Sequence, residues 1–271
     1  MKNRKLETVR TIGLDISKNL FQLHGVDSEG QVVLQRQLRR AEVVRFFSEL
    51  PSCLVGIEAC AGAHAWAREL SRQGHDVRLM PPAYVKPYVR RQKTDAADAA
   101  AICEAVTRPS MRFVPVKTEA HQAVLLQHRT RDLLVRQMTQ TVNAIRAHLA
   151  EFGVVAPAGV RNIDHLLETA AQSVPEHAME AIDVLARQFA ETQARVDEIT
   201  RRIEQAQKED ATARRLASIP GVGVITASAI TATTPDASQF RTSRDYAAWM
   251  GLTPRQHSSG GRERIGHISK M

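Results

Sequence analysis

Four acidic side chains are spaced so that they could converge on one metal site. Asp15 ends the apolar run that begins at Thr11, and Glu58 ends a second apolar run that begins at Cys53. Asp95 and Asp98 lie three residues apart in a helical segment, and residues with this spacing share one helix face. Mg²⁺ prefers oxygen ligands, and two such ions can hold the attacking and leaving oxygens of a phosphodiester displacement. The set therefore indicates metal-dependent chemistry on nucleic-acid strands.

Each acid taken alone has an ordinary explanation. Carboxylates are common at strand ends, and an Asp-x-x-Asp pair near a helix start stabilises the positive end of the helix dipole. What favours a metal site is the order of the set, in which a strand Asp, a strand Glu and a helical Asp-x-x-Asp follow one another within one domain-sized stretch.

The charge of the chain favours a polyanionic partner. Its 271 residues carry a net charge of +8, and 43% of them are hydrophobic, enough for about two domains with real cores. Basic charge suits nucleic acid, although many basic proteins bind none. Only 4% of the residues are aromatic, so phosphate contacts are expected to dominate over base stacking.

The cysteines and the apolar runs exclude several other classes. Cys53, Cys60 and Cys103 are odd in number and do not form a disulfide framework or a zinc-ligand spacing. Cys53 and Cys103 are expected to be small buried residues. The basic N-terminus lacks the apolar segment of a signal peptide, and no apolar run is long enough to span a bilayer. We expect a cytoplasmic protein without a membrane partner.

The elements that must position the acids follow the order βββ-α-β-α-β-α, which is that of an RNase H-like domain with a mixed α/β sheet. The predicted strands are Thr11–Asp15, Phe21–Val26, Gln31–Arg36, Cys53–Glu58 and Asp76–Met80, and the predicted helices between them are Ala41–Leu50 and Ala63–Gln73. The acid-bearing helix follows a basic stretch in which Tyr84 and Tyr88 are interleaved with Lys86, Arg90, Arg91 and Lys93. These cations are placed to hold phosphates beside the acids, and a solvated loop is the alternative.

The second half of the chain reads as helical. Residues 109–117 resemble a linker, and a basic helix is predicted over Thr118–Phe152. Glu176–Lys208 carries an apolar stripe with coiled-coil spacing, which could pair within the chain or with another subunit. Leu216–Ala227 resembles a helix-hairpin-helix whose Gly221 and Gly223 expose backbone N–H groups to phosphate, unless its role is purely structural. A last helix is predicted over Phe240–Met250, and its Tyr246 and Trp249 are expected to be core residues.

Several motifs together resemble one known family. They are Ile12–Lys18, Gly56–Ala59, Lys93–Ala99, Ile219–Gly223, Gly251–Gln256 and Ser258–Gly261, in that order. The chain resembles the DEDD transposases of the insertion-sequence 110 and 1111 group, which are relatives of the Piv-type DNA invertases. The resemblance covers nearly the whole chain.

The resemblance implies a division of labour among three regions. Residues 1–117 would be a RuvC-like domain whose acids Asp15, Glu58, Asp95 and Asp98 bind Mg²⁺, and residues 118–210 a long helical region. Residues 211–271 would be an all-α serine domain, C-terminally truncated because family members normally continue beyond the final Ser-Lys. Its nucleophile would be Ser259, which directly precedes glycine, with Ser258 as the alternative.

The resemblance also implies the partners. The serine would become joined to DNA during strand exchange, and Arg255 would join the residues that contact nucleic acid. A structured non-coding RNA would select the DNA sites, and synapsis would involve a homo-oligomer, a dimer of dimers. Two other hypotheses stay open. One is a RuvC-like nuclease that hydrolyses branched DNA with water, and the other is an inactive nucleic-acid-binding remnant.

Overall fold

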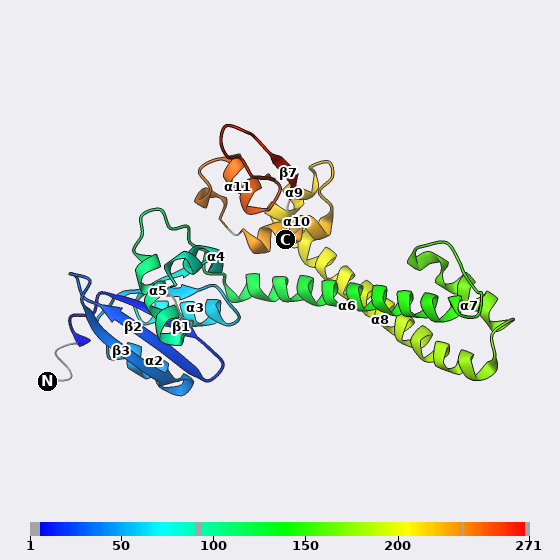
Figure 1. The fold of residues 1–271 in the computed structure, drawn as a ribbon, viewed down its shortest axis with the longest axis horizontal. Helices are drawn as coiled ribbons and strands as arrows, with labels where there is room; N and C mark the ends of the chain where they lie inside the picture. Colours follow the sequence, from blue (N-terminus) through cyan, green and yellow to red (C-terminus); the bar gives the residue numbers. More distant parts are fainter. Residues whose placement is uncertain (1–5, 90–93, 235, 269–271) are drawn as a thin grey trace. The chain divides into compact units, whose positions relative to one another are not determined.

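The computed structural model describes residues 6–89, 94–234 and 236–268, and the chain divides into two compact units, Met1–Thr233 and Thr234–Met271. The first unit contains a five-stranded sheet and the long helices, and the second contains short helices and a two-stranded sheet (Figure 1). The division into three regions at residues 117 and 210 stays a prediction.

The sheet of the first unit is mixed, as the sequence predicts. Its strands stand in the order β3-β2-β1-β4-β5. β2 pairs antiparallel with both β1 and β3, and β4 pairs parallel with both β1 and β5. All five expected strands are present, with ends that differ by up to three residues. β3 runs on to Arg39 because that residue still pairs with Leu20 of β2. The strands are β1 (Thr11–Ile16), β2 (Leu20–Val26), β3 (Val32–Arg39), β4 (Leu54–Glu58) and β5 (Asp76–Met80).

Helices cover both faces of the sheet, because successive residues of a strand point to opposite faces and each face packs against its own helices. α2 (Arg40–Ser48) and α3 (Ala63–Arg72) share a buried apolar core with Ile12 and Leu14 of β1. The edge-to-face contact of Phe21 with Trp66, at 4.9 Å between ring centroids, belongs to this core. α5 (Asp95–Val106) packs against β1, β2 and β4. Successive strand residues point to opposite faces, so Gly13, which contacts α5, faces away from the Ile12 and Leu14 core.

Two short elements and an extended segment complete this part of the unit. α4 (Pro82–Val85) and η1 (Lys86–Tyr88) follow β5 directly and contact α5. The segment 109–117, which resembles a linker in the sequence, is attached to the edge of the sheet. There the N–H of Val114 donates a hydrogen bond of 2.7 Å to the carbonyl oxygen of Leu79.

The long helices form an antiparallel pair. α6 (Glu119–Ala150) and α8 (Glu176–Glu209) lie side by side, and α7 (Ile163–Ala171), preceded by η2 (Val160–Asn162), caps one end of the pair (Figure 1). The stripe residues Ile182 and Phe189 of α8 are buried in one core with Met138, Val142 and Ile145 of α6. Of the two pairings that the sequence leaves open for this stripe, the structure shows the one within the chain.

A shorter helical pair closes the first unit. α9 (Ala211–Ala217) and α10 (Val224–Thr233) pack against each other and against α8, and α10 also packs against α6. His128 of α6 and Ser228 of α10 lie 3.1 Å apart between Nε2 and Oγ. The turn between the two helices contains Gly221 with φ +87°, a conformation that favours glycine.

The C-terminal unit is not all-α, which corrects the sequence expectation. It contains η3 (Ala237–Gln239) and α11 (Ser243–Trp249), and then β6 (Pro254–Gln256) and β7 (Ile265–Ile268), which pair antiparallel. The strands form because Gly260 and Gly261 both have positive φ, +58° and +75°, as a tight hairpin turn requires. Trp249 is 42% exposed, so its expected place in a core is also wrong, although it stacks on Tyr246.

In the part of the chain that the structure describes, no helix combines the length and apolar character needed to cross a membrane.

Candidate active site

A pair of glycines lets α5 approach the sheet. Gly13 of β1 and Gly56 of β4 are register partners in adjacent parallel strands. A Cβ atom at Gly13 would lie 2.1 Å from the carbonyl oxygen of Ala99 and 2.4 Å from the backbone nitrogen of Cys103, both in α5. A Cβ atom at Gly56 would lie 2.8 Å from Cβ of Val106. Only glycine at these positions leaves room for the helix in this arrangement.

The same geometry brings the predicted acids to one end of the helix. Asp15 is two residues after Gly13 and Glu58 two residues after Gly56, so both lie on the sheet face that carries α5. Along α5, Cys103 Sγ contacts the carbonyl oxygen of Thr11, and Ala99 contacts Gly13. The helix therefore runs opposite to β1, and its first residues, Asp95 and Asp98, lie toward the β1 end that carries Asp15.

The burial of the four acids differs. Asp15, Glu58 and Asp98 are half-buried, and Asp95 is exposed. The start of α5 is capped by Thr94, whose side-chain oxygen accepts a hydrogen bond of 3.2 Å from the backbone N–H of Ala97. This cap satisfies an N–H group that has no partner inside the helix, and it defines the first turn on which both aspartates sit.

The pKa of Cys60 is affected by both strand acids. Burial raises the pKa of the Cys60 thiol, and the negative charges of Glu58 and Asp15 raise it further. Among the described residues, however, no three acidic, histidine or cysteine side chains are grouped as a metal site. The donor set fits a hard cation by its chemistry, since four carboxylates supply oxygen ligands only.

The basic stretch beside the acids is described in part. Lys86 lies in η1 and is exposed, which leaves its ammonium group accessible. The other three predicted phosphate contacts of this stretch, Arg90, Arg91 and Lys93, lie outside the described residues.

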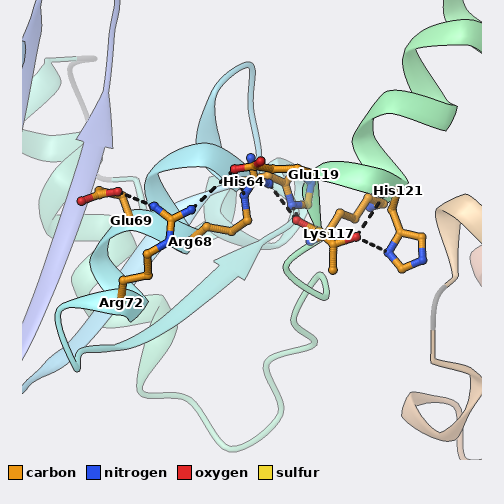
Figure 2. Close-up of polar contacts among 8 residues, drawn as sticks. His64, Arg68, Glu69, Arg72, Lys117, Glu119 and His121 are labelled. Carbon is orange, nitrogen blue, oxygen red and sulfur yellow. Dashed lines mark hydrogen bonds and ion pairs between the residues drawn. The ribbon is translucent and has the colours of Figure 1, made fainter.

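A junction that sequence reasoning missed fastens α3 to the start of α6 (Figure 2). The Arg68 guanidinium donates a 2.8 Å hydrogen bond to the Lys117 carbonyl oxygen, and its Nε lies 3.7 Å from Glu119 Oε1. Arg72 bridges Glu119 and Glu69, at 3.5 and 2.6 Å. Thr118 caps α6 by accepting the N–H of His121. No sequence signal links these residues, because they lie about fifty positions apart.

The electrostatics of this junction are unusual. The backbone N–H of Lys117 donates to Nδ1 of His64 at 3.1 Å, so that imidazole nitrogen acts as an acceptor. Burial lowers the pKa of His64 to about 4, and the charges of Lys117, Arg68 and Arg129 add to the effect. Burial also lowers the pKa of Lys117, whose side chain is 7% exposed. A neutral His64 is therefore part of the attachment of α6.

The turn between α9 and α10 is open to solvent at the predicted phosphate contacts. Gly221 and Gly223 are both exposed, and a Cβ atom at either position would meet nothing within 4 Å. The glycines are thus not needed for close packing within the chain. An open turn at the start of a ten-residue helix is a surface that an anion can approach.

The two candidate serines stand in different positions of the β6–β7 hairpin. Ser259 and Arg262 exchange backbone hydrogen bonds of 3.3 and 3.1 Å around Gly260 and Gly261. The Ser258 hydroxyl accepts from Gln256 Nε2 at 3.0 Å and from the Arg264 N–H at 3.4 Å. Within the described residues of this unit, the Ser259 hydroxyl makes no hydrogen bond. Arg255 lies in β6 and is exposed.

Comparisons with known proteins cover both units. Residues 12–153 match the family model described as "Transposase" of the DEDD IS110 type, and residues 213–271 match the "Transposase IS116/IS110/IS902 family". The chain is 48% identical to the "Probable family 20 transposase" of Pseudomonas aeruginosa, over 96% of this chain and 78% of that protein.

Two further relatives are insertion-sequence proteins. The chain is 38% identical to the "Transposase for insertion sequence element IS1328" of Yersinia enterocolitica, over 98% of this chain and 80% of that protein. It is 35% identical to the "Transposase for insertion sequence element IS1111A" of Coxiella burnetii, over 99% of this chain and 75% of that protein.

Proposed function

We propose that this chain, which belongs to the IS116/IS110/IS902 family of transposases, breaks and rejoins DNA through a serine nucleophile that acts together with four acids. The enzyme is a DNA transposase. The proposal concerns how it works, and the observation that supports it is that Asp15 and Glu58 lie on the sheet face that carries α5, toward the end of that helix that bears Asp95 and Asp98.

The first part of the proposal is a RuvC-like, RNase H-like domain that binds Mg²⁺. The mixed sheet with strand order β3-β2-β1-β4-β5 and a helix across its β1–β4 face supports this fold. Asp15, Glu58, Asp95 and Asp98 would hold the metal. The bound cation would neutralise the charge that develops on the phosphate oxygens.

The second part is the covalent step. Ser259 Oγ forms a bond to the scissile phosphorus, and the bond from that phosphorus to a deoxyribose oxygen breaks. The serine proton is lost, and the leaving oxygen takes up a proton. Rejoining reverses these events with the oxygen of a different DNA end, so no external energy source is needed. A serine hydroxyl is a weak nucleophile at its ordinary pKa, so the cation that the four acids would hold would be needed to position and polarise the phosphate.

The choice of Ser259 over Ser258 is supported by the hairpin. The Ser258 hydroxyl accepts two hydrogen bonds, one from Gln256 on its own side of the hairpin and one from the Arg264 N–H across it. The Ser259 hydroxyl has no such duty among the described residues and is followed by two residues without side chains, so a duplex backbone can approach it. We therefore assign Ser258 to the structure of the hairpin and Ser259 to catalysis.

The third part concerns nucleic-acid contacts. Lys86, Arg90, Arg91 and Lys93 would hold phosphates beside the acids, and the open turn at Gly221 and Gly223, together with Arg255, would hold backbone elsewhere on the substrate. A structured RNA from the mobile element would choose the sites, and synapsis would assemble a dimer of dimers. The net charge of +8 supports such extended contact with polyanions.

A covalent-adduct trap tests the proposal. Labelled donor DNA, RNA transcribed from the flanks of the element, Mg²⁺ and the protein are mixed and separated on a denaturing gel. We expect a protein–DNA band that disappears in Ser259→Ala and in Asp98→Ala. Mass spectrometry of the DNA-linked peptide then identifies the serine directly, and Ser258→Ala serves as the matched control that keeps the band.

Other results would correct the proposal in distinct ways. Cleaved DNA without attached protein, unchanged in Ser259→Ala, would identify a nuclease that uses water. A band linked to Ser258 would reverse the assignment of the two serines. A band that forms equally well without RNA would remove the guide from the proposal but leave the serine chemistry intact.

A further inference from the structure

An open hollow beside the acid-bearing helix has the make-up of a nucleobase site. It measures about 470 Å³ and is lined by Tyr84, Pro87, Tyr88, Ser110, Met111 and Arg112. Two of the three tyrosines of the whole chain line it, in a sequence with only 4% aromatic residues. Such a concentration in one cavity needs an explanation other than general composition.

The geometry of the two tyrosines presents aromatic surface to the hollow. Tyr84 in α4 and Tyr88 in η1 are four residues apart on consecutive helical turns, so they share one face. Val85 between them is 1% exposed and packs into the core under α5 with Ala101 and Ile102. Tyr84 is 46% exposed, although a large apolar ring gains by burial. Its exposed face is a surface on which a flat ring can stack.

The positive charges around the hollow favour a flat ring that belongs to a nucleotide. Arg112 lines it and is exposed, and Lys86 of η1 is exposed between the two tyrosines. The Arg108 guanidinium lies 5.9 Å from the centroid of the Tyr88 ring, so one face of that ring already takes part in a cation–π contact. Aromatic rings beside arginine suit a base that is attached to a phosphate backbone, because stacking and charge attraction then act on the same nucleotide.

We propose that this hollow binds one unpaired base of the DNA strand on which the enzyme acts. The inference rests on the proposed function, since it assumes that DNA lies along the acid-bearing end of α5. α4 and η1, which carry the tyrosines, both contact α5, and Val85 of α4 packs against Ala101 and Ile102, one to two turns beyond the first turn that carries Asp95 and Asp98. A base held here would keep unstacked a strand that continues along α5 toward these acids. Duplex DNA, whose bases are stacked on one another, cannot occupy the hollow in this way.

A fluorescence titration tests the site with the full chain. The probe is a DNA duplex with one bulged 2-aminopurine, and the same duplex with that base paired is the control. On binding the wild-type protein, we expect fluorescence quenching of the bulged base and not of the paired one. Tyr84→Leu should weaken binding of the bulged probe about tenfold and abolish the quenching, whereas duplex affinity should stay within about twofold. Tyr84→Phe, which keeps the ring, should restore both.

Phe152→Leu is the matched control. Phe152 has the same exposed fraction as Tyr84, 46%, and lies after the far end of α6, so its loss should change neither reading. The inference would be overturned if Tyr84→Leu weakened binding of the bulged and the paired duplex equally. It would also be overturned if that variant quenched the bulged base as strongly as the wild-type protein does. Quenching confined to the corresponding RNA bulge would also overturn it. Protein that binds no DNA at low salt would contradict the proposed function itself, which separates the two failures.

Discussion

Gly13 and Gly56 face each other across two parallel strands, and together they form the surface on which α5 lies. This relationship positions the candidate active site, because Asp15 and Glu58 follow the two glycines at the same spacing and Asp98 immediately precedes the α5 residue that touches Gly13. Any side chain at either position would push the helix, and with it two of the four acids, away from the other two.

Gly13→Ala is therefore expected to destabilise the fold by about 1–3 kcal/mol, as overpacking of a core does. It should also abolish strand exchange, because its Cβ would meet backbone atoms of α5 that cannot move aside as a flexible side chain can. Urea unfolding gives the stability and the adduct trap gives the activity. In Gly223→Ala the new methyl group meets nothing within 4 Å, so unfolding should be unchanged. Equal stabilities of the two variants would contradict this account of the glycine pair.

The hairpin turn offers a second test. Gly260 and Gly261 both have positive φ, the arrangement of a type I′ turn, in which asparagine is tolerated at the first central position. Gly260→Asn should therefore keep the hairpin and most of the strand exchange. Gly260→Val should lose the strand exchange. A β-branched residue at positive φ destabilises the turn by at least roughly 1–2 kcal/mol. Activity is measured as the yield of serine–DNA adduct, and similar yields from the two variants would show that the turn does not hold Ser259.

The junction around His64 makes stability depend on pH. The pKa of His64 is about 4 in the folded chain and near 6.5 when unfolded, so the unfolded chain takes up the proton first as the pH falls. The free energy of unfolding should decrease between about pH 6.5 and 4. Urea unfolding at a series of pH values measures this slope.

His64→Gln should reduce that slope without removing it, because burial also lowers the pKa of His24 and His128. The same change at exposed His148 is the control and should leave the slope as it is. A slope that is unchanged in His64→Gln would show that the neutral imidazole does not contribute to the attachment of α6.

The three cysteines should differ in reactivity. Burial raises the pKa of Cys53 to about 12 and that of Cys103 to about 11, and only the thiolate reacts readily. Cys60 is exposed. We expect one thiol to be alkylated in the native protein at pH 8 and three in urea, with the native one lost in Cys60→Ser. Peptide mapping by mass spectrometry identifies the sites. Native alkylation of Cys103 would mean that α5 separates from β1 in solution.

Local pattern was enough for most elements and for the candidate acids. Strand Thr11–Ile16 and helix Glu176–Glu209 follow from short-range periodicity, and the motif containing Asp95 and Asp98 carries the family resemblance in its own few residues. The hairpin of β6 and β7 is not among the predicted elements, although Gly260-Gly261 between short segments with strand-like residues is a recognisable turn signal. The same motif carries the candidate serine and the two glycines of the turn.

By itself, the sequence determined the family and the order of the elements around the five-stranded sheet, and it offered the four acids as candidates, because each of these depends on neighbouring residues. The tertiary structure decided everything that depends on residues far apart in the chain. Only the packing of α5 shows why Gly13 and Gly56 must be glycine, and only the attachment of α3 to α6 shows that burial, with the charge of Lys117 added, lowers the pKa of His64. Likewise, only the hairpin shows that the Ser258 hydroxyl accepts two hydrogen bonds. The physical reason is that steric contact, burial and hydrogen bonding act through space, whereas a motif records only what is adjacent along the chain.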